Sequence, residues 1–420
     1  MKLETTIIEK DSKGIIIQIS IPFCKDMLLS EEVIQQGVNQ VGTVATEYAL
    51  SVFDTDGSPI QVGEQKYTSK GQVPKIYQCP FGEFELSRHV YQSNTGGSTY
   101  CPLDVDARVL KSSTPKFAKS VSCKYSRSGA RDVQSDLSDN HGRSISRTYI
   151  QNISDAVGRV ASSKPWEYSV EVASSDVQTV AFSLDGTCML LRKDGWRQAM
   201  VGSISFYDRG GERLHTTYMA QAPEYGKETF LRDFAKEIKR VKKLYKDKTY
   251  IGIADGAKDN WIFLQDFCNV QILDYYHASE YLTKVSRAFF TDKSKSETWT
   301  KLSCHTLKHE KGGVKILLEE MKDMLKKKMS DVRKKEIETA ITYFTNHLHQ
   351  MDYPFYLSAN FPIGSGVVES ACKVIVKQRM CNSGMRWTEE SASNVLVLRC
   401  FDKTNNKWTQ FWNKVRKWGY

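Results

Sequence analysis

The chain has 420 residues, and its 59 lysines and arginines against 49 acidic residues give a formal net charge of +10 at pH 7. This length allows two to four domains, and the charge suits a polyanionic partner such as nucleic acid. No apolar stretch approaches the roughly 18 to 20 residues that span a bilayer, and the first residues lack the apolar segment of a signal peptide. We therefore expect a soluble cytoplasmic protein with no membrane partner.

Ten cysteines are scattered along the chain without a C-x-x-C pair, which in a reducing compartment indicates small buried side chains. The one cluster worth testing as a metal site is Cys79, His89 and Cys101. Zinc ligands usually occur as close pairs, and this set has neither the pairing nor a clear fourth member. A zinc site is therefore not expected there.

Residues 1–110 mix helical and strand-like patterns. One apolar helical face spans residues 33–52, and strand-like runs occupy 75–79 and 83–93, followed by the turn sequence NTGG. This mixture predicts an N-terminal α+β domain.

Residues 111–165 are predicted to be helical. Thr114-Pro115 is a helix-start signal, the turn Asn140-His141-Gly142 separates two apolar helical stripes, and Ser144 is the expected cap of the second helix. Two helices joined by a glycine turn, with Arg143, Arg147 and Arg159 on the outer side, are typical of a helix-turn-helix that binds DNA. A helical linker with solvated arginines fits the pattern equally well.

From residue 177 the pattern predicts three strands, a helix, a strand, a short helix and a further strand. The strand-like runs are 177–186, 196–208, 213–223, 250–254 and 270–273, and the helices are 227–245 and 261–267. The order βββαβαβ is that of a ribonuclease-H-like core, in which the first strand lies beside the fourth. Asp185 and Asp255, which follow the apolar parts of these strands, would then be neighbours.

Two carboxylates so placed repel one another unless a cation lies between them, and hard oxygen ligands suit Mg²⁺ or Mn²⁺. Taken singly, Asp255 could be part of an ordinary Asp-Gly turn, and Asp274 could be the N-cap of the following helix. A third carboxylate, Glu369, begins a predicted helix after Gly364-Ser365-Gly366, with Lys373 and Lys377 expected on its face. A solvated Glu-Lys pair is the plain alternative.

Several longer blocks carry a resemblance. They are SLDG (183–186), ADGAKDNW (254–261), ILDYYHASEYL (272–282), GSGVVESACK (364–373) and QRMCNSGMRWTEESASNVLVLR (378–399), with a weaker match in GGSTYCPLD (96–104). From about residue 90 to its end the chain resembles the DDE transposases of bacterial insertion sequences, specifically the Kra-type insertion-sequence family, which is related to Mutator-like transposases. Relatives often have amino-terminal cysteine pairs, and here only Cys79 and Cys101 remain.

The resemblance implies a catalytic core formed by residues 177–284 and 360–400, with Asp185, Asp255 and Glu369 holding two Mg²⁺ or Mn²⁺ ions. It also implies a D-x-x-H element, here Asp274 and His277, acting on the scissile phosphate; a structural Asp-His hydrogen bond is the alternative.

The second and third acids are 114 positions apart in the sequence, which predicts an insertion, and residues 285–359 have a helical, lysine-rich pattern. Trp299 within it could stack on an unpaired base, or could be a core residue. The basic and aromatic tail, residues 401–420, and the cation Arg379 are expected to contact the DNA backbone.

The expected activity is cleavage of DNA at the ends of an insertion sequence and transfer of the 3′ hydroxyl into target DNA. The partners would be the element ends and the target DNA, and a dimer or higher oligomer would join two ends at the nucleoid. The alternatives are a ribonuclease-H-like nuclease that only hydrolyses nucleic acid, and a domesticated DNA-binding regulator.

Overall fold

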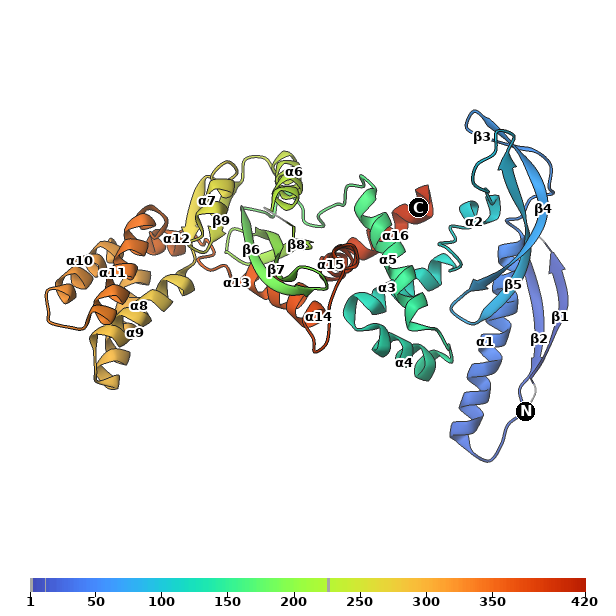
Figure 1. The fold of residues 1–420 in the computed structure, drawn as a ribbon, viewed down its shortest axis with the longest axis horizontal. Coiled ribbons are helices and arrows are strands. Elements are labelled where there is room, and N and C mark those ends of the chain that lie inside the picture. Colours follow the sequence, from blue (N-terminus) through green and yellow to red (C-terminus); the bar gives the residue numbers. More distant parts are fainter. Residues whose placement is uncertain (1–2, 12, 225–226) are drawn as a thin grey trace. The chain divides into compact units, whose positions relative to one another are not determined.

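The computed structural model describes residues 3–11, 13–224 and 227–420 of a mixed α/β chain that is about half helical (Figure 1). The chain divides into two compact units. Unit 1 contains residues 1–168, 393–402 and 407–420, and unit 2 contains residues 169–392 and 403–406. Among the described residues, no helix combines the length and the apolar character needed to cross a membrane.

The first part of unit 1 is α+β, as the sequence predicted. Its core contains Tyr77, Cys79, Phe84 and Leu103, all buried. The elements are the antiparallel hairpin β1 (Glu4–Asp11) and β2 (Gly14–Ser20), the helix α1 (Met27–Ser51), and the antiparallel sheet of β3 (Ile60–Val62), β4 (Gln65–Gln78) and β5 (Glu83–Ser93).

The remainder of unit 1 is helical. Val133, Leu137, Ile153 and Val157, all from the predicted apolar stripes, are buried. The cap of the second predicted helix is Ser146 and not Ser144, because the Ser146 side chain accepts the bond from Tyr149 N–H. The helices are α2 (Pro102–Asp106), α3 (Pro115–Arg127), α4 (Ala130–His141), α5 (Arg147–Ser163), most of α15 (Glu389–Lys403), and α16 (Lys407–Trp418).

Unit 2 is built on a five-stranded mixed sheet with the order β10-β9-β6-β7-β8. The first three strands form an antiparallel meander, and the last two are added in parallel at the other side of β6. The prediction that the first strand of this region lies beside the fourth is confirmed. The strands are β6 (Thr179–Leu191), β7 (Gly195–Tyr207), β8 (Arg213–Gln221), β9 (Thr249–Ala254) and β10 (Val270–Leu273).

The connections between the parallel strands are helical. Phe230, Phe234, Ile238 and Val241 recur at helical spacing in α6 (Glu228–Leu244) and are buried in the core of unit 2. The shorter α7 (Lys258–Leu264) links β9 to β10 and begins three residues before the predicted helix.

The predicted insertion is helical throughout its regular elements, and it forms a bundle beside the sheet within unit 2 (Figure 1). The first helix of this bundle, α8 (Tyr275–Phe289), begins ten residues before the predicted start of the insertion at residue 285. The other elements are α9 (Lys293–His309), α10 (Gly313–Leu325), α11 (Asp331–Asn346), η1 (Leu348–Gln350) and α12 (Tyr353–Ser358). The chain then passes through α13 (Gly366–Ala371), the π-helix η2 (Cys372–Lys377) and α14 (Gln378–Met380).

Candidate active site

Asp185 and Asp255 lie at the same level of two neighbouring strands. The parallel register of β6 and β9 pairs Ser183 with Ile253, and each aspartate follows two residues later. Both side chains are partly buried. The sheet therefore brings together two carboxylates that are 70 residues apart in the sequence.

Asp185 is the more constrained of the two carboxylates. Its Oδ1 accepts a bond from the Gly186 N–H at 2.6 Å, and its Oδ2 accepts one from the Cys372 thiol at 3.6 Å. Burial raises the pKa of Asp185, and the negative charges of Asp255 and Glu369 raise it further, while the Gly186 N–H opposes this shift. The charges of the other two predicted acids thus act on Asp185.

Asp255 organises the loop that follows β9. Its Oδ1 accepts bonds from the Ala257 N–H at 3.1 Å and from the Asn260 side-chain amide at 3.2 Å, and Asn260 is itself buried. The first bond is the Asp-turn contact expected from the Asp-Gly sequence. The same carboxylate can both shape this loop and face Asp185.

Asp274 is fully buried and caps α8. Its Oδ1 accepts a bond from the backbone N–H of His277 at 2.8 Å, and its Oδ2 accepts one from the backbone N–H of Ser365. Asp274 and His277 therefore share a structural hydrogen bond, but it joins the Asp274 carboxylate to the His277 backbone N–H and not to its ring. The expectation that Asp274 is the N-cap of the following helix is confirmed.

His277 and Glu369 lie together although they come from α8 and α13. The Nε2 of His277 is 3.7 Å from Oε1 of Glu369, and its Nδ1 is 3.9 Å from the Glu280 carboxylate. Oε1 of Glu369 also accepts a bond from the Ser365 hydroxyl at 2.6 Å. The structure thus places the D-x-x-H element next to the third predicted acid.

The predicted helix that follows Glu369 is not α-helical throughout. It begins as α13 and continues through Lys373 and Lys377 as the π-helix η2. Lys373 and Lys377 are exposed, and Lys377 Nζ donates to the Cys188 carbonyl at 3.2 Å. Arg379 is buried against the Trp387 ring, with 5.2 Å to the ring centroid, and does not belong to this surface.

The other predicted DNA contacts divide in the same way. Arg147 and Arg159 are exposed on α5, whereas Arg143 is buried instead of lying on the outer side. Arg143 donates to the Gln78 side chain at 2.6 Å and stacks on Phe117. The helical stripe could not reveal this, because the partner is contributed by β4.

Trp299 is a buried residue of the insertion. Its indole N–H donates to the Glu320 carboxylate at 2.7 Å, and its ring packs near Phe290. Trp299 is therefore a core residue, which was the alternative to base stacking. A base could reach its ring only if the insertion rearranged.

The Cys79, His89 and Cys101 cluster makes other contacts. Cys79 is fully buried in the core of the first sheet, and His89 Nδ1 pairs with the Asp54 carboxylate at 3.0 Å. Cys101 stands before the first residue of α2. Each of the three is thus explained by its own neighbours.

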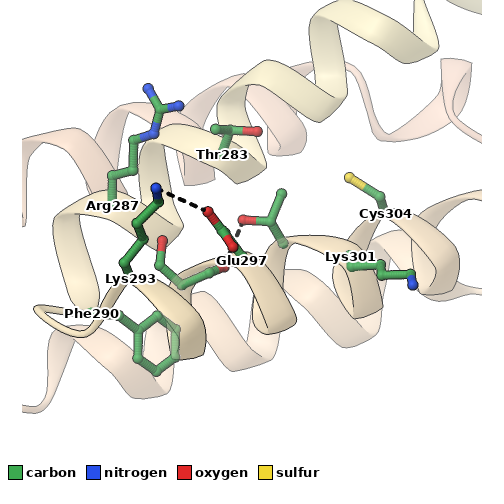
Figure 2. A pocket seen from close by; sticks show the side chains of 9 residues that line it. Thr283, Arg287, Phe290, Lys293, Glu297, Lys301 and Cys304 are labelled. Atoms are coloured by element: carbon green, nitrogen blue, oxygen red, sulfur yellow. Dashed lines mark hydrogen bonds and ion pairs between the residues drawn. The ribbon is translucent and has the colours of Figure 1, made fainter.

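The insertion also contains a cavity of about 460 Å³ between α8 and α9 (Figure 2). Arg287, Lys293 and Lys301 surround it, and Lys293 pairs with Glu297 at 3.8 Å. The lining is therefore basic overall, and it includes none of the acids predicted for catalysis.

The chemistry of the three acids fits a hard divalent cation. Their donors are carboxylate oxygens. Burial first, and then the charges of Asp255 and Glu369, raise the pKa of Asp185, and a bound cation would favour its ionised form. Among the described residues, no group of three or more histidine, cysteine, aspartate or glutamate side chains is arranged so that it could hold a metal ion.

Sequence reasoning missed two residues that contact the acids. Ser365 was read only as part of a helix start, and Cys372 only as a small buried cysteine, yet they contact Glu369 and Asp185 respectively. Their position inside the block 364–373 was the available signal. Tyr343 of α11 was also missed; burial, its neighbour Tyr281 and the nearby Asp255 raise its pKa.

Comparison of the chain with models of known protein families gives no match, and comparison with curated proteins gives none.

Proposed function

We propose that the protein is a DDE-type transposase whose ribonuclease-H-like core cleaves DNA and joins a 3′ hydroxyl to a target strand. The observation that carries the proposal is the register of β6 and β9, which ends at the pair Ser183 and Ile253, two residues before Asp185 and Asp255. The strand order β10-β9-β6-β7-β8 and the sequence blocks described above support it. A fold by itself does not define a function, so the carboxylates carry the argument.

In this proposal Asp185, Asp255 and Glu369 would supply the carboxylates that hold divalent cations. When bound, Mg²⁺ or Mn²⁺ ions supply Lewis acidity at the scissile phosphate and acidify the attacking hydroxyl. His277 is 40% exposed and lies beside Glu369, so its imidazole can donate to a phosphate oxygen. The thiol of Cys372 donates to Asp185 and orients its carboxylate.

The proposed partners are the ends of the element and the target DNA, and the proposed location is the bacterial nucleoid. The net charge of +10 supports a polyanionic partner. Arg147, Arg159, Lys373 and Lys377 are exposed cations that can contact phosphates. A dimer or higher oligomer follows from the reaction, since two ends have to be joined.

The decisive experiment is a strand-transfer assay with labelled DNA from the borders of the gene and a supercoiled target, with Mg²⁺ or Mn²⁺ and with EDTA. We expect joined products that EDTA abolishes. The Asp255→Asn variant should lose cleavage and joining by about 10²-fold or more while retaining DNA binding.

Asp259→Asn is the matched control, because Asp259 is an exposed aspartate in the first turn of α7, the helix that follows the Asp255 loop. Its activity should equal that of the wild type. If the protein cuts DNA in a metal-dependent way but does not join the ends, it is a hydrolytic nuclease and not a transposase. If the protein binds DNA but neither cuts nor joins it, a DNA-binding regulator is the remaining interpretation. If Asp255→Asn still cleaves DNA, Asp255 is not a catalytic residue.

A further inference from the structure

A chain of buried polar contacts connects the end of β10 to Glu369. Asp274 begins it: its backbone N–H donates to the Ala254 carbonyl at 3.0 Å, and its side chain is fully buried. The two oxygens of Asp274 accept bonds from the backbone N–H groups of His277 and Ser365. A buried carboxylate held on both oxygens has little freedom to move.

Ser365 carries the connection onward. It is 4% exposed, and its hydroxyl donates to Oε1 of Glu369 at 2.6 Å. The backbone N–H of Ser365 is used by Asp274, and its carbonyl accepts from the Glu369 N–H at 3.1 Å. The only polar group of Ser365 that acts on the Glu369 carboxylate is therefore the hydroxyl.

The two carboxylate oxygens of Glu369 have different surroundings. Oε1 accepts the Ser365 hydroxyl and lies 3.7 Å from His277 Nε2. Oε2 accepts no hydrogen bond from any residue that the structure describes, and the side chain is 46% exposed. A carboxylate held through one oxygen presents the other oxygen in a restricted direction.

We infer that Ser365 is a positioning residue that holds Glu369 through Oε1 and leaves Oε2 for a divalent cation, with Asp274 as its buried anchor. This inference rests on the proposed function. It assigns different tasks to the two aspartates that end strands: Asp255 faces the cation, and Asp274 positions Glu369 from behind. An ordinary contact between residues four apart at a helix start would need no such anchor.

The test is a titration of the protein with Mn²⁺ in the absence of DNA. Binding is measured by electron paramagnetic resonance as the decrease in the signal of free Mn²⁺. Ser365→Ala should weaken Mn²⁺ binding about tenfold, in the range found for outer partners of metal ligands. Ser365→Thr keeps the hydroxyl and should restore most of the affinity. The thermal midpoint of each variant checks that the fold is retained.

If Ser365→Ala destabilises the protein, a double-mutant cycle of Ser365→Ala with Glu369→Gln still tests the inference. In a Glu369→Gln background, Ser365→Ala should cause no further loss of Mn²⁺ affinity, because the hydroxyl acts only through Glu369. Additive losses, or a Ser365→Ala variant that binds Mn²⁺ as tightly as the wild type, would overturn the inference.

The same titration separates this inference from the proposed function. If Asp255→Asn abolishes Mn²⁺ binding and Ser365→Ala leaves it unchanged, only the role of Ser365 fails. If Asp255→Asn also binds Mn²⁺ like the wild type, the carboxylate site itself is wrong.

Discussion

At the scale of the residue, Asp185 combines burial with like charge. Its neighbours supply one backbone N–H and one weak thiol donor, which only partly offset the loss of solvation. Burial also raises the pKa of Cys372, and the adjacent Asp185 adds to this, so the thiol stays protonated and able to donate. A partly buried carboxylate with so few donors costs the folded state stability when it is ionised.

The raised pKa of Asp185 predicts the pH dependence of stability in metal-free protein. The folded state binds this proton more tightly than the unfolded state, so the contribution of Asp185 to stability should fall as pH rises from 3.8 through the raised folded pKa. At neutral pH, Asp185→Asn should therefore raise the thermal midpoint, on the order of 2 °C.

Thermal unfolding in EDTA between pH 4 and pH 8 measures this effect. The gap between Asp185→Asn and the wild type should widen with pH, and Mg²⁺ should narrow it by stabilising the wild type. The exposed Asp259→Asn should follow the wild type. A lower midpoint for Asp185→Asn at neutral pH would contradict the electrostatic argument.

At the scale of the element, the loop after β9 packs against the helical insertion. A Cβ on Gly256 would lie 2.3 Å from Cε2 of Tyr343, and Tyr343 is stacked on Tyr281 with ring centroids 3.9 Å apart. The ring therefore has little room to retreat. The loop that carries Asp255 and the helices α8 and α11 are packed as one block.

Gly256→Ala should accordingly destabilise unit 2 by about 1–3 kcal/mol, the usual effect of overpacking, and should reduce cleavage by displacing Asp255. Urea unfolding measures the first effect, and the cleavage assay the second. Gly366→Ala is the stability control, since its Cβ would meet nothing within 4 Å. Wild-type stability of Gly256→Ala would show that the two tyrosine rings can yield.

At the scale of the whole molecule, the positive charge is divided between exposed and buried cations. Arg147 and Arg159 are exposed, whereas Arg143 and Arg379 are buried in the interior of their own units. Only exposed cations can release counterions from DNA when they meet phosphates. The net charge alone therefore overstates the surface available to DNA.

Affinity for duplex DNA should fall linearly with the logarithm of salt concentration. Replacing Arg147 and Arg159 by alanine should weaken binding and lower the slope by about 1 for each phosphate that the variant no longer neutralises. Fluorescence anisotropy at low and at moderate NaCl concentrations measures the slope. Lys13→Ala, an exposed cation at the β1–β2 hairpin, is the control. An unchanged slope would place the DNA surface elsewhere.

The sequence by itself determined the order of strands and helices in unit 2 and the aspartates Asp255 and Asp274 that follow β9 and β10. The predicted end of the first strand at residue 186 was wrong, because β6 continues to Leu191 in its pairing with β7. Apolar runs and helical spacing predicted the order of the elements, and the ribonuclease-H-like arrangement that this order matches predicted β6 beside β9. This arrangement was also enough to propose the pair Asp185 and Asp255.

Only the tertiary structure decided which polar groups meet. The burial of Arg143 by Gln78, the bond between Trp299 and Glu320, and the path from Asp274 through Ser365 to Glu369 each join distant or separately folded segments. A hydrogen bond depends on distance and direction between particular atoms, which periodicity does not encode. The sequence was therefore enough to propose the three acids. The hydrogen bonds that hold Glu369 depend on the packing of α13 against the start of α8, which only the tertiary structure shows.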